Sequence, residues 1–366
     1  MRKILSGLII LTVLATVAFT GCGQSKERSG SNITASQEET AASASTKPAN
    51  KELKKFRVGY LPSTGHVLYF VAKEKGYFEE EGLDVEFSLF ANSAEGLNAM
   101  KAGKLDAGSF GTAPPLTFIA KGTDFTIFGG QMSQGHALIA KPENADTFKD
   151  LKNYKGKKIG VVRLSTGDIV FRGGLKEAGL DWSKDLTINE FESQGSVLEA
   201  VKKGTVDAGI VWPPYRKMAE DQGLKVVKQS GEIFKEHPCC RQVALTADIK
   251  KDPDSYLRFT TALIKAYKFY KNNLDETVEY TAKYIKVDKN IIKSEVYGDY
   301  ISNNPDPNKE GVVKFWDFMN KIGFISSADK IEKYINTDIF KNALNNVLKS
   351  NPEDKDYLLL KSGFKE

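Results

Sequence analysis

The stretch NAMKAGKLDAG at residues 98–108 returns as EAVKKGTVDAG at residues 199–209. Each copy predicts the end of an amphipathic helix, a glycine that stops it, and a short buried strand entered through an aspartate. Glycine ends a helix at low conformational cost because it can take a positive φ just beyond the last turn. Asp106 and Asp207 are 101 residues apart. That spacing is too long for a solenoid repeat and suits a duplicated domain.

Other parts of the chain repeat in the same order. The turn at 63–65 reads STG and returns at 165–167, and the glycine at 59 returns at 160, so each copy covers about 55 residues. Strands are expected at 56–61, 84–90 and 105–110, and again at 158–162, 186–191 and 206–211, with helices between them. This alternation predicts a parallel arrangement of these strands, covered by helices, with right-handed crossovers.

The C-terminal third predicts helices. One long amphipathic helix is expected after residue 252, followed by helices at 274–286, 289–297, 308–322 and 337–349, and by a loosely packed segment from residue 351. The chain is expected to leave the first lobe near 139–143 and to return near 241–246. Two crossings make a hinge, and a ligand would bind in the cleft between the lobes.

The predicted fold class is therefore α/β, with two lobes, each a mixed sheet flanked by helices, and a helical C-terminal segment. Lobe I comprises 55–141 and 244–366, and lobe II comprises 142–243. A chain of 366 residues with 41% hydrophobic and 27% charged residues can build two cores of this size.

The first 54 residues predict export. Arg2 and Lys3 precede an apolar run at 4–19, which is typical of a signal peptide over residues 1–21. Residues 22–54 are rich in Ser, Ala, Thr, Glu and Lys and predict a disordered tether. Removal of Arg2 and Lys3 lowers the formal charge from +5 to +3, and no basic block indicates nucleic-acid binding.

Phe19-Thr20-Gly21-Cys22 resembles a bacterial lipobox, although Phe19 stands where Leu is usual. The resemblance implies that Cys22 is lipidated and that the mature chain is anchored outside the cytoplasm to the cell membrane. The alternative is ordinary secretion with Cys22 removed or left free.

Three segments carry a resemblance to a known family. GYLPSTGHVLYFVAKEKGYFEEEGLDV at 59–85, AGKLDAGSFG at 102–111 and DAGIVW at 207–212 resemble the solute-binding proteins of nitrate, sulfonate and taurine ABC importers. The same superfamily includes proteins that bind or make thiamine pyrimidine precursors. The likeness covers roughly residues 55–300. It implies a type II periplasmic-binding-protein fold that closes on its ligand and delivers it to an ABC permease with its ATPase.

Two turns are the first candidate binding elements. Each is expected at the carboxyl end of a strand, where ligands gather in open α/β sheets, and each begins a helix whose free N–H groups favour anions. Asp168 would repel an anion or bind an amine, and ordinary helix capping remains the alternative for both turns. The candidates are Ser63, Thr64, Gly65 and His66 in the first turn and Ser165, Thr166, Gly167 and Asp168 in the second.

Further candidates follow the other strands. The loop after the third strand of lobe I is expected in the cleft, and its counterpart in lobe II carries an aromatic wall, although a packed core position is the alternative for each. These candidates are Phe90, Ser109, Phe110, Gly111, Thr112, Gln194, Trp212 and Tyr215.

The segment HPCCR at 237–241 falls at the second expected crossing. Arg241 is a candidate counter-charge for a sulfonate or carboxylate because its guanidinium can bind such groups through two nitrogens. Cys239 and Cys240 could line the pocket, form a vicinal disulfide, or be buried thiols.

The sequence favours a binding protein over an enzyme. It has no nucleophile elbow, phosphate-binding loop or zincin motif, and its three histidines lack metal-ligand spacing. We expect a monomer without metal or cofactor that captures a small organic solute, a sulfonate-, taurine- or nitrate-like anion being favoured. The alternatives are a pyrimidine or other heteroaromatic thiamine-precursor ligand, an enzyme similar to the pyrimidine-precursor synthases, or a sensor without transport.

Overall fold

The computed structural model describes residues 52–366. The predicted signal peptide, Cys22 and nearly all of the predicted tether lie outside the described residues. Among residues 52–366, no helix is long and apolar enough to cross a membrane.

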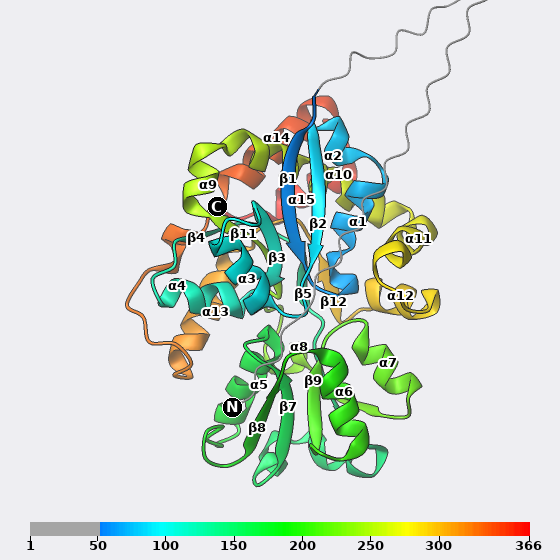
Figure 1. The fold of residues 1–366 in the computed structure, drawn as a ribbon, viewed down its shortest axis with the longest axis vertical. Coiled ribbons are helices and arrows are strands. Elements are labelled where there is room, and N and C mark those ends of the chain that lie inside the picture. The colour runs from blue at the N-terminus through cyan, green and yellow to red at the C-terminus, as the bar shows by residue number, and fades with distance from the viewer. Residues whose placement is uncertain (1–51) are drawn as a thin grey trace, which may run out of the picture. The chain divides into compact units, whose positions relative to one another are not determined.

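The first five-stranded sheet has the order β2-β1-β3-β11-β4 (Figure 1). β1 is parallel to β2 and β3, whereas β11 is antiparallel to β3 and β4. Its strands are β1 (Lys54–Tyr60), β2 (Leu83–Leu89), β3 (Ala107–Gly111), β4 (Phe125–Gly130) and β11 (Cys240–Leu245). The sheet is therefore mixed, as predicted.

The second five-stranded sheet repeats this plan, with the order β8-β7-β9-β6-β10 when read from its parallel edge. β7 is parallel to β8 and β9, and β6 is antiparallel to β9 and β10. Its strands are β6 (Ala137–Ala140), β7 (Lys158–Val162), β8 (Thr187–Phe191), β9 (Ala208–Val211) and β10 (Lys225–Gln229).

Each sheet thus includes one strand that directly follows a crossing of the chain from the other sheet. β6 lies in the second sheet immediately after the chain leaves the first, and β11 lies in the first sheet after the chain returns. A separate pair, β5 (Met132–Gln134) and β12 (Ile301–Asn303), lies at the first crossing. The lobe boundaries that the sequence suggested stay a prediction. β6, a strand of the second sheet, begins at Ala137, four residues before the predicted end of this part of lobe I at residue 141.

The duplicated stretches have equivalent places in the two sheets. Gly59 pairs with Gly108 between β1 and β3, and Gly160 pairs with Gly209 between β7 and β9. Each of these stretches is the end of a helix, α3 (Ser93–Lys101) or α6 (Gln194–Lys203), followed by the third strand. The repeat is therefore architectural.

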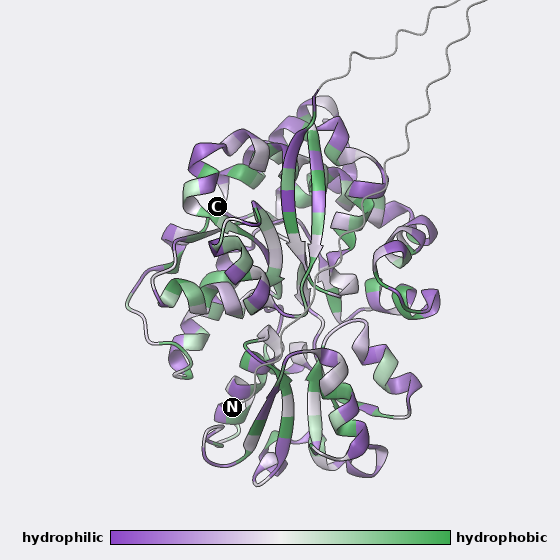
Figure 2. Cartoon of the chain, in the orientation of Figure 1, coloured by the Kyte–Doolittle hydropathy of each residue, from purple (hydrophilic) through white to green (hydrophobic). Residues whose placement is uncertain are grey.

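Helices cover both sheets, and Figure 2 shows hydrophilic and hydrophobic residues on different sides of many of them. The helices of the first copy are α1 (Val67–Glu74), α2 (Tyr77–Glu80), α3 and α4 (Ala113–Ala120), after the short 3-10 helix η1 (Thr64–His66). Those of the second copy are α5 (Thr166–Glu177), α6, α7 (Tyr215–Asp221) and α8 (Ser230–Ile233), and 3-10 turns η2 (Pro142–Asn144), η3 (Thr147–Lys149) and η4 (Leu151–Tyr154) precede β7.

The C-terminal part is helical, as predicted. Its elements are α9 (Thr246–Lys251), α10 (Pro253–Asn272), α11 (Leu274–Tyr284), α12 (Lys289–Val296), α13 (Lys309–Lys321), η5 (Ile331–Tyr334), α14 (Asp338–Ser350) and α15 (Lys355–Gly363). The long helix α10 packs against α1, α2 and α14, and its buried face joins the main hydrophobic core of the first sheet. In the last segment Tyr357 and Leu360 are buried, whereas Leu358 and Leu359 are exposed.

Candidate binding cavity

A small cavity lies where the two sheets' carboxyl-end turns meet. It is lined by Leu61, Ser63, Ser93, Gly111, Met132, His136, Ser165, Thr166, Trp212, Cys239 and Cys240. All the free space between these side chains is about 290 Å³, of which the centre of a water molecule can reach about 20 Å³. Since binding sites for small molecules are usually larger, the structure shows the cleft in a shut arrangement.

Contacts between elements of the two sheets hold this arrangement. Ala113 N, at the start of α4, donates to Thr166 Oγ1 of α5 at 3.3 Å. The Asn92 side-chain amide donates to the backbone carbonyl of Glu192 at 3.4 Å. A solute could therefore enter only when the lobes move apart.

The hydroxyl groups of the cavity share one feature. Each accepts a hydrogen bond from a backbone N–H, so each keeps its own proton for a bound acceptor. Ser63 Oγ accepts from Gly65 N at 3.1 Å, Ser93 Oγ from Gly111 N at 3.2 Å, Ser165 Oγ from Asp168 N at 3.2 Å, and Thr166 Oγ1 from Ala113 N at 3.3 Å. Trp212 Nε1 adds a buried N–H with no partner among the described residues.

No side chain that lines the cavity carries a formal charge. The exception would be His136, but burial, with a smaller contribution from His237, lowers its pKa to about 3, so the ring is neutral near pH 7. The cavity thus offers converging neutral donors.

A thiol-rich wall closes the other side. The Sγ atoms of Cys239 and Cys240 are 3.7 Å apart, and His136 Nδ1 lies 3.8 Å from Cys239 Sγ. Both cysteines are free and buried, and burial raises the pKa of the Cys239 thiol well above its ordinary value. Of the three alternatives for these residues, the first describes this structure, because both free thiols line the cavity and form no disulfide.

Within residues 52–366, no group of three or more His, Cys, Asp and Glu side chains is arranged to hold a metal ion.

Five predicted site residues line the cavity: Ser63, Gly111, Ser165, Thr166 and Trp212. They come from both turns and from the ends of both third strands, and this placement brings the two copies of the repeat together. Their contact with a ligand stays a prediction.

The first turn places its other candidates behind the cavity. Thr64, Gly65 and His66 are buried, and Leu61 N donates to His66 Nε2 at 3.4 Å. A Cβ on Gly65 would meet Met132 Sδ at 2.3 Å, so glycine is needed there for packing.

Asp168 and Arg241 have partners other than a ligand. Asp168 accepts two hydrogen bonds from Arg172, at 2.8 and 3.1 Å, and burial raises its pKa to about 6 despite that cation. Arg241 donates to the carbonyls of Asp306 and Met132 at 2.9 and 2.7 Å. The structure therefore does not place the Arg241 guanidinium as a counter-charge in the cavity.

The remaining candidates support the walls. Phe110 fills the space beside the glycines of its sheet, Phe90 packs on Phe110, and Ser109 is buried. Thr112 Oγ1 donates to Cys239 O at 2.6 Å, and Gln194 Oε1 accepts from Trp212 N at 2.5 Å. Gly167 packs on His136, and Tyr215 packs in the second sheet's core. None of these seven lines the cavity.

Sequence reasoning missed Leu61, Ser93, Met132 and His136. Ser93 could have been found, because it lies 101 residues before the candidate Gln194, the same offset as the repeat. Met132 and His136 belong to the crossing between the sheets, where no repeat signal exists.

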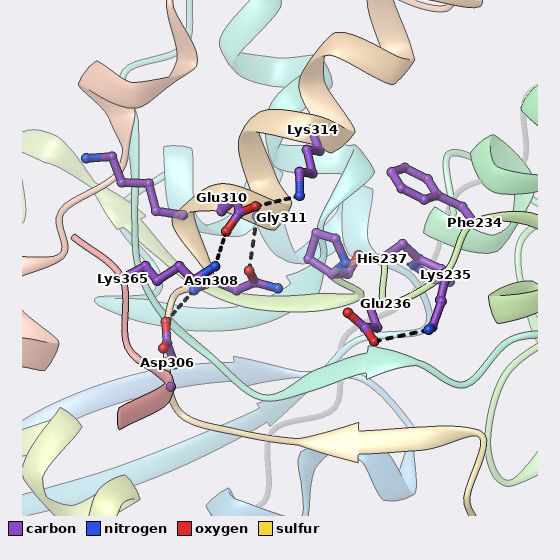
Figure 3. Close-up of a pocket in the computed structure, with 13 residues that line it drawn as sticks. Phe234, Lys235, Glu236, His237, Asp306, Asn308, Glu310, Gly311, Lys314 and Lys365 are labelled. Atoms are coloured by element: carbon purple, nitrogen blue, oxygen red, sulfur yellow. Dashed lines mark hydrogen bonds and ion pairs between the residues drawn. The ribbon is translucent and has the colours of Figure 1, made fainter. Parts of the chain in front are cut away.

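A second hollow, with about 800 Å³ of free space, lies beside the start of α13 (Figure 3). Five of its charged groups pair with one another: Glu310 with Lys314 and Lys365, and Lys235 with Glu236. Because most of the charges in this hollow are already paired, the smaller cavity between the sheets is the better binding candidate.

Comparison with known sequences identifies the family. A profile of the NMT1-like family matches residues 49–286, well over half of the chain. The chain belongs to the NMT1-like family. A Bacillus subtilis relative named as an aliphatic sulfonates-binding protein is 28% identical over 249 residues, which cover 67% of this chain and 74% of the relative.

Solved structures of similar fold confirm the predicted architecture. The nitrate-binding protein NrtA from Synechocystis PCC 6803 has a TM-score of 0.71 at 16% identity, covering 84% of this chain and 92% of NrtA. The aliphatic sulphonate-binding protein SsuA from Escherichia coli has a TM-score of 0.65 at 19% identity, covering 79% of this chain and 99% of SsuA. The fold is that of the periplasmic binding proteins, and the predicted resemblance is confirmed.

Proposed function

We propose that this NMT1-like protein is the extracytoplasmic solute-binding protein of an ABC importer and that it captures a small oxyanion, a short alkanesulfonate being favoured. The observation that carries the proposal is the set of four hydroxyl donors and one indole N–H around a cavity lined by no formal charge. The oxygens of an oxyanion accept several hydrogen bonds at once, and such charge-assisted bonds are stronger than bonds between neutral groups.

The second turn adds a helix end to these donors. Ser165 and Thr166 begin α5, a helix of 12 residues, and the N-terminal end of a helix favours an anion by dipole and by free N–H groups. Asp168 in the same turn is paired with Arg172, which removes the repulsion that the sequence alone suggested.

The apolar and sulfur-containing side chains of the cavity determine which group can be attached to the oxyanion. Leu61, Met132 and Trp212 offer contact to a short apolar group next to the oxyanion. Taurine-like ligands would bring an ammonium group that has no carboxylate partner among the residues lining the cavity. A short alkanesulfonate therefore suits the cavity better than taurine.

Anchoring and delivery complete the proposal. The lipobox-like Phe19–Cys22 supports lipidation at Cys22, which would hold the chain at the outer face of the cell membrane. A monomer that docks on a permease, which works with its ATPase, fits the similarity in fold to the nitrate-binding and sulphonate-binding proteins. No enzymatic reaction is proposed.

A thermal-shift and calorimetric screen of the mature full chain tests ligand capture. Methanesulfonate and ethanesulfonate should raise the melting temperature, because a ligand that binds only the folded state stabilises it by mass action. Nitrate, sulfate, taurine, acetate and an aminopyrimidine are the comparators. Ser165→Ala with Thr166→Val should weaken sulfonate binding at least tenfold, and Arg258→Met, which changes a partly exposed side chain on α10, is the control.

Two outcomes would refute the proposal. One is stabilisation by the aminopyrimidine alone, and the other is the absence of stabilisation by every solute in a folded, ligand-free preparation. Lipidation is tested separately: incorporation of labelled palmitate should disappear in Cys22→Ala.

A further inference from the structure

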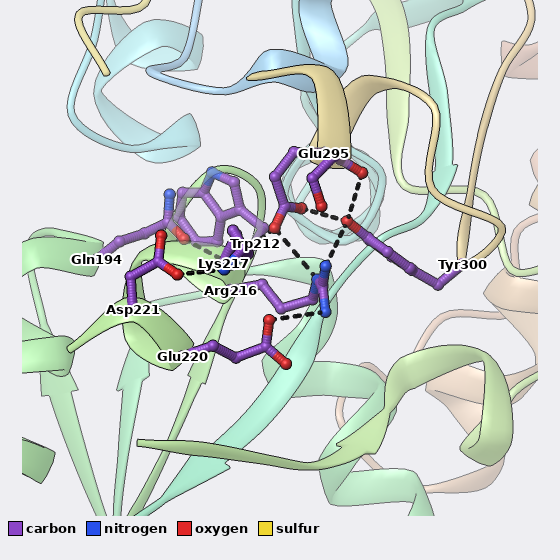
Figure 4. A network of polar contacts seen from close by, with 9 residues as sticks. Gln194, Trp212, Arg216, Lys217, Glu220, Asp221, Glu295 and Tyr300 are labelled. Carbon is purple, nitrogen blue, oxygen red and sulfur yellow. Dashed lines mark hydrogen bonds and ion pairs between the residues drawn. The ribbon is translucent and has the colours of Figure 1, made fainter. Parts of the chain in front are cut away.

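A polar network joins helices of the two sheets and lies near Trp212, a residue that lines the cavity (Figure 4). Arg216 lies on α7, which packs against β6, β10 and α6 of the second sheet. Glu295 lies on α12, which packs against α11 and η1 on the side of the first sheet. Their ion pair therefore crosses from one lobe to the other.

The network combines an ion pair, hydrogen bonds and a cation–π contact. Arg216 Nε lies 3.2 Å from Glu295 Oε1, which also accepts a hydrogen bond from Lys217 N at 2.8 Å. Tyr300 donates its hydroxyl to Glu295 Oε2 at 2.6 Å and accepts from Arg216 Nη2 at 2.8 Å. The guanidinium also lies over the Tyr300 ring, 4.0 Å from its centroid.

Both charges are removed from water. The Glu295 side chain is 0% exposed and that of Arg216 is 10% exposed. A buried charge without its partner is strongly unfavourable, whereas a pair replaced by neutral groups of similar shape is often tolerated. Loss of the Arg216 guanidinium alone would therefore leave Glu295 as a buried charge without a cation and would disfavour the shut cleft.

The network is linked to the cavity through a short piece of chain. Trp212 lines the cavity, and its backbone N–H donates to Gln194 Oε1. Its backbone carbonyl accepts a hydrogen bond from Tyr215 N, at the start of α7, at 2.9 Å. Arg216 is the next residue. A displacement of α7 from α12 would therefore move the Trp212 wall with it.

We propose that Arg216 and Glu295 are positioning residues for ligand capture: their ion pair, completed by Tyr300, sets where α7 docks on α12 and so holds Trp212 against the cavity. The role in capture rests on the proposed function. The role in closure does not.

The pair makes an asymmetric prediction for its variants. Arg216→Met leaves Glu295 buried without a cation and should favour the open arrangement. Glu295→Gln keeps an oxygen for Lys217 N and leaves Arg216 with Tyr300 and Glu220, so its effect should be smaller. The double variant has no buried charge and should close again.

Small-angle X-ray scattering of the mature full chain without ligand tests closure. Arg216→Met should increase the radius of gyration, and Arg216→Met/Glu295→Gln should return it toward that of the wild type. Arg258→Met removes a partly exposed ion pair with Asp254 within one helix and is the matched control. An unchanged radius for Arg216→Met, or a double variant as open as the single one, overturns the inference.

Affinity for ethanesulfonate tests capture in the same four proteins. Arg216→Met should weaken binding at least tenfold, mainly through faster dissociation, and the double variant should recover to within about threefold of the wild type, since apparent affinity follows the fraction of protein in the competent state. A single variant that binds like the wild type refutes the positioning role. If the wild type binds none of the oxyanions in the screen, the proposed function fails, while the scattering result still decides closure.

Discussion

The two copies of the repeat share a hydrogen-bonded frame and differ in what they present to the cavity. In the first copy Ser93 Oγ accepts from Gly111 N, and in the second Gln194 Oε1 accepts from Trp212 N, at the equivalent place 101 residues later. The frame is the same, yet one copy ends in a glycine and the other in the largest side chain. Gly111 leaves room, and Trp212 forms the opposite wall.

The strand entries show the same relation. Asp106 accepts from Arg57 N at 2.7 Å, and Asp207 accepts from Lys158 N at 2.8 Å, each across 49 residues. Only Asp106 also binds a guanidinium, through Arg57 Nε and Nη2. The duplication thus kept the backbone contacts that build the fold, while side chains beyond them diverged.

Replacing the glycine of the first copy by the tryptophan of the second copy should cause the largest loss of ligand affinity. Gly111→Trp would make both copies alike, but even a Cβ at Gly111 meets Thr166 Oγ1 at 2.9 Å, so the lobes could not shut on a ligand. We expect at least a hundredfold loss of sulfonate affinity by calorimetry. Gly363→Ala, where a Cβ meets nothing within 4 Å, should bind normally. A Gly111→Trp protein that retains affinity would show that closure does not bring these walls together.

Removing the aspartate at the strand entry should lower the free energy of unfolding more in the first copy than in the second. Asp106→Ala should cost about 2 kcal/mol and Asp207→Ala about 1 kcal/mol, because the first loses a charged partner as well as a backbone N–H. Urea unfolding measures both values. In an Arg57→Met background the two losses should become equal; a persistent gap would mean that the guanidinium is not the cause.

The residues at the fourth position of the two turns should make stability depend on pH in opposite directions. His66 and Asp168 are equivalent, and burial lowers the pKa of His66 to about 3. Below its ordinary pKa of 6.5, the unfolded chain binds a proton that folded His66 does not, so stability falls as pH drops. From pH 7.5 to 5.5 His66 should contribute a loss of about 1.4 kcal/mol.

His66→Gln tests this contribution through the pH dependence of its urea midpoint. The fall between pH 7.5 and 5.5 should be smaller than in the wild type, whatever the variant's stability at pH 7.5. Asp168 acts with the opposite sign, since burial raises its pKa to about 6 and stability from this group decreases as pH rises from about 4 to 6. An identical pH profile for His66→Gln would contradict the assignment.

The caps of the two turns should give the smallest difference. Ser165 caps α5, a full helix, whereas Ser63 caps the three-residue turn η1. Ser165→Ala should cost about 1 kcal/mol and Ser63→Ala a few tenths, as judged by thermal unfolding without ligand. The Thr alternatives at both positions keep the oxygen and should restore most of the loss. A larger cost at Ser63 would reverse our ranking of the two turns.

Much of the fold was predictable because its signals are local. Strands β1, β2, β3, β7, β8 and β9 and the C-terminal helices α11 to α14 lie within a few residues of their predicted ranges. Periodicity, glycine stops and the repeat register all act over short stretches. The strands β4, β5, β6, β10 and β12 were not assigned, because each is stabilised by a partner distant in sequence.

The site was predictable only in part. The repeat placed Gly111 and Trp212 at equivalent strand ends, and the turn pattern placed Ser63, Ser165 and Thr166. Arg241 looked like a ligand partner because of its charge and its place near the crossing. Its actual partners, the carbonyls of Met132 and Asp306, come from segments whose approach no local pattern shows.

The sequence by itself determined the duplication, the order of strands and helices in each copy, and the residues at the strand ends, since these follow from spacing and backbone chemistry along the chain. Only the tertiary structure decided that β6 lies in the second sheet and that β11 lies between β3 and β4. It also decided that Met132, His136 and the two cysteines close the cavity and that Arg216 meets Glu295. The reason is that a cavity and a buried ion pair depend on groups from remote segments arriving together. Their energies arise from burial and from paired charges, which exist only after the chain has packed.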